Sequence, residues 1–250
     1  MLSLFKNKLS PSIHNNIGDI GIDFHAHWLP GVDDGCQTID DSILLLSEFK
    51  RLGYKKVYAS PHIMGDKYTN TKQDLMERFE IFKSDERVQS LQLELGLIAE
   101  YLLDEQFEDK LKANDFLTIG DKHILVETSM NYEFPFVKDY LFELIKLGYK
   151  PILAHPERYR YIYNEKNYVE KYEELMFNGI ELQLNMFSLI GLYGDTSRKV
   201  AEALIENEAY TFVCSDIHLP SQIKYFEAAQ KSLFLEKLIK SNKLKNLEFY

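Results

Sequence analysis

The segment Asp23-Phe24-His25-Ala26-His27 indicates both the fold and the chemistry of this chain. Side chains alternate along an extended strand, so the two histidines point to one side while Phe24 packs on the other. Two imidazoles at one strand end are a ready pair of nitrogen ligands for a divalent metal. Such a pair also occurs on exposed strands without a metal, so its meaning depends on the rest of the chain.

Hydrophobic runs alternate with amphipathic stretches along the whole chain. The expected strands are residues 19–25, 55–60, 91–99, 123–128, 151–154, 180–183 and 210–215. The expected helices include residues 41–52, 72–87, 136–147, 166–178 and 196–206. Short strands that alternate with helices favour parallel pairing through right-handed crossovers. Seven such units predict an α/β fold, a distorted TIM-like (β/α)7 barrel.

No linker rich in Pro, Gly or Ser divides the 250 residues. We therefore expect one domain, residues 19–250, preceded by an N-terminal extension, residues 1–18, that packs outside the barrel. No apolar run approaches the length of about 18 residues that a membrane span needs, and we expect no membrane insertion. The short apolar start, interrupted by Lys6 and Lys8, does not fit a signal peptide. These features predict a cytoplasmic protein.

The charge and the cysteines narrow the function further. The net charge is −10 and there is no basic cluster, which argues against nucleic acid as a partner. The two cysteines, Cys36 and Cys214, lie far apart, so a disulfide framework is not expected. A cysteine phosphatase needs an arginine six positions after its nucleophile, and those positions hold Ser42 and Pro220. Covalent catalysis by cysteine therefore lacks support.

Residues that can bind metal follow nearly every predicted strand. Reactive side chains of a (β/α) barrel gather at the C-terminal ends of its strands. Every strand but the sixth places histidine or carboxylate there: His25, His27, Asp34, His62, Glu100, Glu127, His155, Asp216 and His218. This set without cysteine suits Mn, Fe or Zn in a hydrolytic site. Nine ligands are too many for one ion, so we expect two or three divalent ions that generate a hydroxide and promote displacement at phosphorus.

Several segments also resemble a known superfamily. They are Asp23-Phe24-His25-Ala26-His27, Leu29-Pro30-Gly31-Val32-Asp33-Asp34-Gly35, Ser60-Pro61-His62, Ala154-His155-Pro156-Glu157-Arg158-Tyr159 and Ser215-Asp216-Ile217-His218. Together they resemble the polymerase-and-histidinol-phosphatase (PHP) superfamily. Within it, the chain is most similar to the bacterial protein-tyrosine phosphatases of capsule and exopolysaccharide operons. The resemblance extends from about Asp19 to His218.

The resemblance implies three metal ions and a role for each ligand. The first ion would be held by His25, His27, Glu100 and Asp216. The second would share Glu100 and add Glu127 and His155. The third would be held by Asp34, His62 and His218.

The resemblance also implies a mechanism and a substrate. Arg158 would bind phosphate through its planar guanidinium fork, and Asp216 and His218 would belong to the catalytic machinery. A metal-bound hydroxide would attack phosphotyrosine without a phosphoenzyme, with Mn as the expected metal and Fe or Zn as alternatives. The substrate would be a phosphotyrosyl protein, for example a bacterial tyrosine kinase of polysaccharide export, in the control of capsule synthesis.

The chain departs from its relatives at one position. Relatives often carry a second arginine after the last Asp-x-His, whereas this chain has Leu219-Pro220-Ser221-Gln222-Ile223-Lys224. Lys224 is a candidate substitute as a point charge. The N-terminal extension is also longer than in the shortest relatives.

Alternatives stay open at several residues. Asp33 could be the ligand in place of Asp34. Glu157 could support a ligand from behind or pair with Arg158, rather than bind a metal itself. The run Tyr159-Arg160-Tyr161-Ile162-Tyr163 could form an aromatic wall for a phenyl ring, although helix packing is the commoner role of such a run.

Three other functions compete with tyrosine phosphatase. A small-molecule phosphatase such as histidinol phosphatase would share the metals and the mechanism. An amidohydrolase-type barrel also starts with His-x-His, but it usually bridges its metals through a modified lysine where this chain has Glu127. A silent metal-binding module would typically lose ligands, whereas all nine positions are filled.

Overall fold

Parallel strands form the centre of the protein. The computed structural model describes residues 16–250, so most of the predicted N-terminal extension lies outside the described residues. The strands are β1 (Ile22–Asp23), β2 (Lys56–Ala59), β3 (His62–Ile63), β4 (Glu94–Leu97), β5 (Glu100–Leu102), β6 (His123–Glu127), β7 (Lys150–Ala154), β8 (Glu181–Asn185) and β9 (Phe212–Cys214). One sheet has the order β1-β2-β4 and the other β3-β5-β6-β7-β8-β9, and every pair is parallel.

Two of the seven predicted strands are each followed by a second short strand that belongs to the other sheet. Residues 55–60 correspond to β2, and the chain continues past Pro61 into β3. Proline has no N–H to donate to a ladder, which favours a break at this position. The neighbouring strand breaks at the same level, between β4 and β5, where Ile98 N donates to Ala59 O and Glu100 N to Pro61 O. The prediction of an α/β fold with parallel strands is confirmed, but the strands form two sheets rather than one continuous barrel sheet.

The two sheets meet beyond the ends of β1 and β9. Ala26 and Ile217 form an isolated parallel bridge. His27 N donates to Ile217 O at 2.8 Å, and Asp216 N donates to His25 O at 2.8 Å. The segment that carries the first two histidines therefore lies directly beside the segment that carries Asp216.

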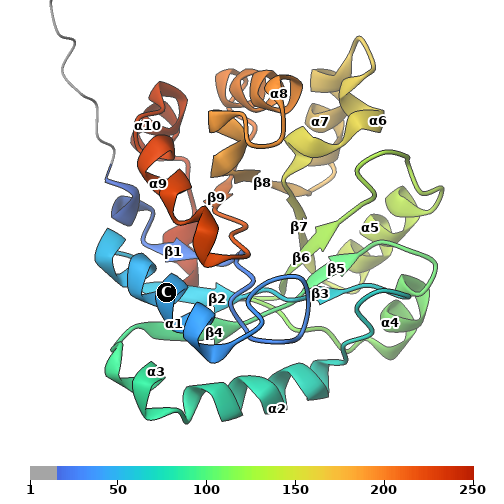
Figure 1. The fold of residues 1–250 in the computed structure, drawn as a ribbon. Coiled ribbons are helices and arrows are strands. Elements are labelled where there is room, and N and C mark those ends of the chain that lie inside the picture. Colours follow the sequence, from blue (N-terminus) through green and yellow to red (C-terminus); the bar gives the residue numbers. More distant parts are fainter. Residues whose placement is uncertain (1–15) are drawn as a thin grey trace, which may run out of the picture.

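Helices lie on the outer side of the strands (Figure 1). They are α1 (Ile39–Leu52), α2 (Lys72–Lys83), α3 (Glu86–Ser90), α4 (Phe107–Ala113), α5 (Val137–Lys146), α6 (Arg160–Tyr163), α7 (Tyr168–Phe177), α8 (Asp195–Glu206), α9 (Lys224–Ala229) and α10 (Leu233–Lys240). Short 3-10 helices are η1 (Ile17–Ile20), η2 (Pro156–Arg158), η3 (Met186–Ile190), η4 (Pro220–Gln222) and η5 (Asn246–Phe249). None of the helices in the described residues combines the length and the apolar character that crossing a membrane requires.

The helix ends follow local signals in the sequence. The Thr38 side chain accepts from Asp41 N at the start of α1, and Gly53 ends that helix with a left-handed φ of 92°. The predicted helix 72–87 is wrong as a single helix, because the chain turns at Ser84 and Asp85. The Asp85 carboxylate accepts from Arg87 N and starts α3.

The C-terminal 3-10 helix η5 closes the apolar end of the strands. Phe249 packs 5.3 Å from the ring of Phe24 and 5.2 Å from that of Phe212. Asn246 is buried; its side-chain oxygen accepts from Val213 N, and its amide donates to Ile22 O and Val213 O. The C-terminal segment thus supports β1 and β9 on the side opposite to His25.

We predict that Asn246→Ala lowers the free energy of unfolding by about 2–4 kcal/mol, because it leaves buried backbone groups without partners. Urea unfolding followed by circular dichroism measures the change. Tyr250→Ala, at an exposed neighbouring position, is the control and should shift stability by less than about 0.5 kcal/mol. Equal midpoints for both variants would contradict the role of Asn246.

Candidate metal centre

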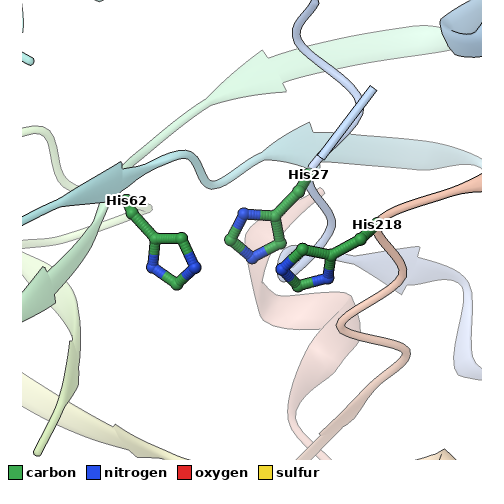
Figure 2. A group of neighbouring side chains, drawn as sticks. All are labelled: His27, His62 and His218. Carbon is green, nitrogen blue, oxygen red and sulfur yellow. The ribbon is translucent and has the colours of Figure 1, made fainter. Parts of the chain in front are cut away.

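The nine predicted ligands lie together at one end of the parallel strands. His25 and His27 follow β1, Asp34 lies in the next loop, His62 starts β3, Glu100 starts β5, Glu127 ends β6, His155 follows β7, and Asp216 and His218 follow β9. Figure 2 shows the imidazoles of His27, His62 and His218 side by side. The ring centres of His27 and His218 are 3.9 Å apart, and those of His27 and His62 are 4.5 Å apart.

The carboxylate of Glu100 is the centre of the cluster and is fully buried. Its Oε2 lies 3.2 Å from His25 Nε2 and 3.1 Å from His62 Nδ1. The same oxygen lies 3.5 Å from His27 Nε2. The other oxygen, Oε1, lies 3.0 Å from His155 Nε2. One carboxylate therefore faces four imidazoles.

Several of these atoms face one another without forming a hydrogen bond. The buried atoms without a hydrogen-bond partner in the described residues include His25 Nε2, His27 Nε2, His62 Nδ1, Glu100 Oε2 and Glu127 Oε1. Buried polar atoms in proteins are almost always paired, so such a group needs an explanation. Two ligands at about 2.1 Å from one tetrahedral ion lie about 3.4 Å apart, close to the separations around Glu100 Oε2. The donor set therefore fits divalent metal.

Four sets of side chains bring their ligand atoms within 4.8 Å of one another. They are His25, His27, Glu100 and Asp216; His62, Glu100 and Glu127; His27, His62 and His218; and Asp33, Asp34 and His62. The first set coincides with the first implied ion. In the second, His62 stands where the resemblance implies His155, whose Nε2 lies 3.8 Å from Glu127 Oε2.

Buried polar partners orient the two histidines of the opening segment. His25 Nδ1 donates to Gln183 Oε1 at 2.8 Å, and the Gln183 amide nitrogen donates to Leu184 O. His27 Nδ1 donates to Asp33 Oδ2 at 2.8 Å. In each ring the other nitrogen, Nε2, faces the cluster, which is how proteins orient metal-binding imidazoles. The sixth predicted strand lacks a ligand, yet it supplies Gln183.

The two neighbouring aspartates have different surroundings. Asp33 is buried and accepts from Gly35 N and His62 N as well as from His27. Gly35 allows this tight loop, because a Cβ there would lie 2.0 Å from His27 O. Asp34 is half exposed, with Oδ1 3.5 Å from His62 Nε2 and 3.7 Å from His218 Nε2. Asp33 therefore positions His27, and Asp34 faces the open side of the cluster.

Arg158 and Glu157 point in opposite directions. Arg158 donates to Asp216 Oδ2 at 2.8 Å and stacks 4.1 Å from the centre of the Tyr193 ring. Glu157 is fully buried and accepts from the hydroxyls of Ser188 and Tyr210. Glu157 forms no ion pair with Arg158, so the expected pairing is wrong. It instead accepts from Asn185 N, and the Asn185 amide donates to Asp216, so Glu157 supports the cluster from behind.

The buried charges support one another. Burial raises the pKa of Glu100, but His25 and His62 hold it well below its usual range. Burial likewise raises the pKa of Asp216, and His25 and His27 lower it well below its usual range. Burial lowers the pKa of His25, which Glu100 and Asp216 raise well above its ordinary value. The carboxylates at the centre are therefore ionised and available to a cation.

Two of the predicted ligands have unusual backbone conformations. His155 has a φ of 34° and Asp216 a φ of 52°, both in the left-handed region that side chains other than glycine rarely adopt. His155 directly follows β7, and Asp216 lies two residues after the end of β9. Such conformations occur where a functional geometry outweighs the local cost.

A cavity of about 340 Å³ opens above the cluster. Its polar side includes Glu100, Glu127, His155, Asp216 and Arg158. Its apolar side consists of Met64, Leu102, Met130 and Tyr132. The cavity can therefore hold a ligand that places one end at the metal-ligand side chains and Arg158 and another end against apolar side chains.

The residues considered for an aromatic wall and for a second cation do not line this cavity. Tyr159 is buried, and its hydroxyl donates to Ala154 O. Tyr161 forms a hydrogen bond with the Thr128 hydroxyl. Lys224 packs over the ring of Tyr225. The cation nearest to the open side is Lys67, whose Nζ lies 3.9 Å from Asp34 Oδ2.

Comparison with known proteins places this site in a family. The family described as "Capsular polysaccharide synthesis, CpsB/CapC" matches residues 21–245, nearly the whole chain. The chain belongs to this family. The matched region contains all nine residues of the cluster as well as Arg158.

Relatives in the family extend over most of the chain. CapC of Staphylococcus aureus is 28% identical over 226 residues, which cover 90% of this chain and 84% of the relative. The tyrosine-protein phosphatase CpsB of Streptococcus pneumoniae is 29% identical over 219 residues, or 83% of this chain and 87% of the relative.

A solved structure has the same fold. It comes from a study of YwqE from Bacillus subtilis and CpsB from Streptococcus pneumoniae, described as unique metal-dependent tyrosine phosphatases. The TM-score is 0.76 at 26% identity, and the match covers 90% of this chain and 89% of the other.

We predict that Glu100→Gln removes most metal binding, because it replaces the negatively charged carboxylate that faces four imidazoles with a neutral amide. The metal content after loading with Mn²⁺ and desalting, measured by mass spectrometry, should fall from two or three ions per chain to one or none. Mn²⁺ at 100-fold excess over its Kd should also stabilise the wild type by roughly 3 kcal/mol, and the variant much less. Glu133→Gln, at an exposed glutamate, is the control. Equal metal content in both variants would contradict the assignment.

Proposed function

We propose that this protein is a metal-dependent protein-tyrosine phosphatase. The observation that carries the proposal is the cavity. It is lined by metal-ligand side chains, some of whose buried atoms have no hydrogen-bond partner, by the Arg158 guanidinium, and by apolar side chains. Relatives named as tyrosine-protein phosphatases support the same reaction. A cysteine nucleophile is disfavoured, since Cys36 is buried and burial raises the pKa of its thiol to about 12.

We assign the nine clustered residues to two or three divalent ions, with Mn as the expected metal and Fe or Zn as alternatives. One ion would be held by His25, His27, Glu100 and Asp216. Glu100 would be shared with a second ion held by Glu127 and His155. Asp34, His62 and His218 would hold a third. When bound, such ions lower the pKa of a water nucleophile and neutralise charge on the phosphoryl oxygens.

The side chains of the chain itself would orient the substrate. Arg158 would bind the phosphate, because its guanidinium lines the cavity and has donors beyond the one used by Asp216. The phenyl ring would lie against Met64, Leu102, Met130 and Tyr132. Asp216, which also accepts from the Asn185 amide, would hold Arg158 in place. His218 would belong to the catalytic machinery at the rim of the cavity, where its Nδ1 donates to Asp216 O.

The remaining predictions form part of the same proposal. We propose that residues 19–250 form a single domain in which the parallel strands surround a common axis as a distorted (β/α)7 barrel of PHP type. The physiological substrate would be a phosphotyrosyl protein of capsule or exopolysaccharide synthesis, such as a tyrosine kinase of polysaccharide export. The reaction would take place in the cytoplasm.

We predict that the Mn-loaded protein releases phosphate from a phosphotyrosyl peptide with a kcat/KM at least tenfold above that for histidinol phosphate. The apolar wall should favour a phenyl ring over a charged imidazole and amine. Phosphate release by one preparation, with and without chelator, measures the preference. A higher kcat/KM for histidinol phosphate would assign the protein to small-molecule phosphatases instead.

We predict that Arg158→Ala lowers kcat/KM for a phosphotyrosyl peptide by about 100-fold or more, the usual cost of losing a positioned charged donor. Arg158→Lys should recover only part of the loss, since an ammonium cannot form the planar fork. Arg160→Ala, at an exposed neighbouring arginine, is the control and should behave as wild type. Unchanged kinetics in both Arg158 variants, with metal content intact, would exclude this arginine from phosphate binding.

A further inference from the structure

A second hollow lies on the surface between helices α4 and α5. It has a volume of about 480 Å³, and its apolar lining consists of Leu111, Phe136, Tyr140 and Leu147. Phe136 is 52% exposed and Leu147 is 38% exposed. Large apolar side chains grouped at the surface in this way commonly mark a binding site. The metal centre does not use this groove.

One loop contributes both to the candidate active-site cavity and to the groove. Tyr132 lines the cavity and Phe136 lines the groove, and both belong to the loop between β6 and α5. Four residues of chain span at most about 14 Å. Between them in the loop, the ring of Phe134 lies 5.6 Å from that of Phe136 and 6.0 Å from that of Tyr140, so it packs against the groove residues. An extended peptide could therefore follow this loop from the cavity to the groove.

The polar lining of the groove is predominantly acidic. It contains Glu108, Asp139 and Glu143 but only one base, Lys112. Lys112 pairs with Glu108 at 2.9 Å. Glu143 pairs with Lys146 at 2.7 Å, whereas Asp139 forms no ion pair with any described residue. Asp139 is thus the negative charge left for an occupant.

We propose that this groove binds the segment of the substrate protein that flanks the phosphotyrosine, and that it selects a basic residue next to an apolar one. The inference rests on the proposed function, because the phosphotyrosine in the cavity fixes one end of the segment. An extended chain advances about 3.3 Å per residue, so at most about four substrate residues separate the level of Tyr132 from that of Phe136, and we expect the basic residue about four positions from the phosphotyrosine. Asp139 attracts that residue, and Phe136 packs against its apolar neighbour.

Two phosphotyrosyl peptides of equal length test the groove. One carries Lys-Leu pairs about four positions to either side of the phosphotyrosine, and the other carries Glu-Ser pairs at those positions. The Mn-loaded wild type should show a kcat/KM about five- to tenfold higher for the Lys-Leu peptide, as expected for one exposed charge contact with some packing. The difference should lie in KM and should shrink at high salt.

The variant Asp139→Lys/Phe136→Ser should abolish or reverse this preference and leave p-nitrophenyl phosphate hydrolysis unchanged. Its control is Glu173→Lys/Phe177→Ser, which makes the same changes at exposed positions of α7. Equal preference in the wild type and the groove variant would overturn the proposal. So would a change of oligomeric state in the groove variant, because the groove would then be a contact between copies.

Failure of the proposed function can be recognised separately. If the Mn-loaded wild type hydrolyses neither the peptides nor p-nitrophenyl phosphate, then it is not a phosphatase of this class. Fluorescence anisotropy of the labelled peptides then tests the groove alone. Tighter binding of the Lys-Leu peptide by the wild type than by the groove variant supports the groove, and equal binding refutes it.

Discussion

The concentration of ionisable side chains around the Glu100 carboxylate, all removed from water, is the constraint on which the rest of the structure depends. A buried carboxylate without a partner costs several kcal/mol, so its surroundings must supply positive charge. In this protein the imidazoles of His25 and His62 supply it within 3.2 Å. Divalent ions would supply more charge in the same space. Removing one member leaves its partners buried and uncompensated, so the cluster is stable only as a unit.

The backbone around the cluster is held from both ends of the strands. On the side of the cluster, the buried Asp23 carboxylate accepts from His25 N at 3.0 Å and from Ser215 N at 2.8 Å. Burial raises the pKa of Asp23 to about 6, although these backbone donors lower it. On the opposite side, the Asn246 side chain joins the backbones of β1 and β9. These two polar clamps keep His25 beside Asp216, and a left-handed φ at Asp216 is maintained because the chain on either side of it is fixed.

The clustering of these nine residues could be predicted from the sequence, because metal binding accepts few residue types and parallel strands deliver them to one end. The orienting residues could not, since their role depends on distant partners. Gln183 is 158 positions away from His25, and within its own strand it resembles any polar residue. The run from Tyr159 to Tyr163 allowed an aromatic wall as a minority role beside helix packing, whereas the exposed Tyr132 of another loop lines the cavity. Pro61 is a residue in the sequence that favours the end of β2. The matching break between β4 and β5 depends on the pairing of neighbouring strands, which the sequence of one strand does not show.

The position of Arg158 suits the role in phosphate binding that we propose for it. A guanidinium has five donors, and Asp216 takes one of them through Nη1. The Tyr193 ring covers one face of the group at 4.1 Å, so its plane is fixed before a ligand arrives. Burial lowers the pKa of Arg158, but the Asp216 carboxylate raises it by more. The pKa therefore lies above its ordinary value, and the guanidinium keeps its charge. An arginine oriented in advance would lose little side-chain entropy on binding a phosphate group. Lys67, beside Asp34 on the open side, adds positive charge at the rim without needing the same precision.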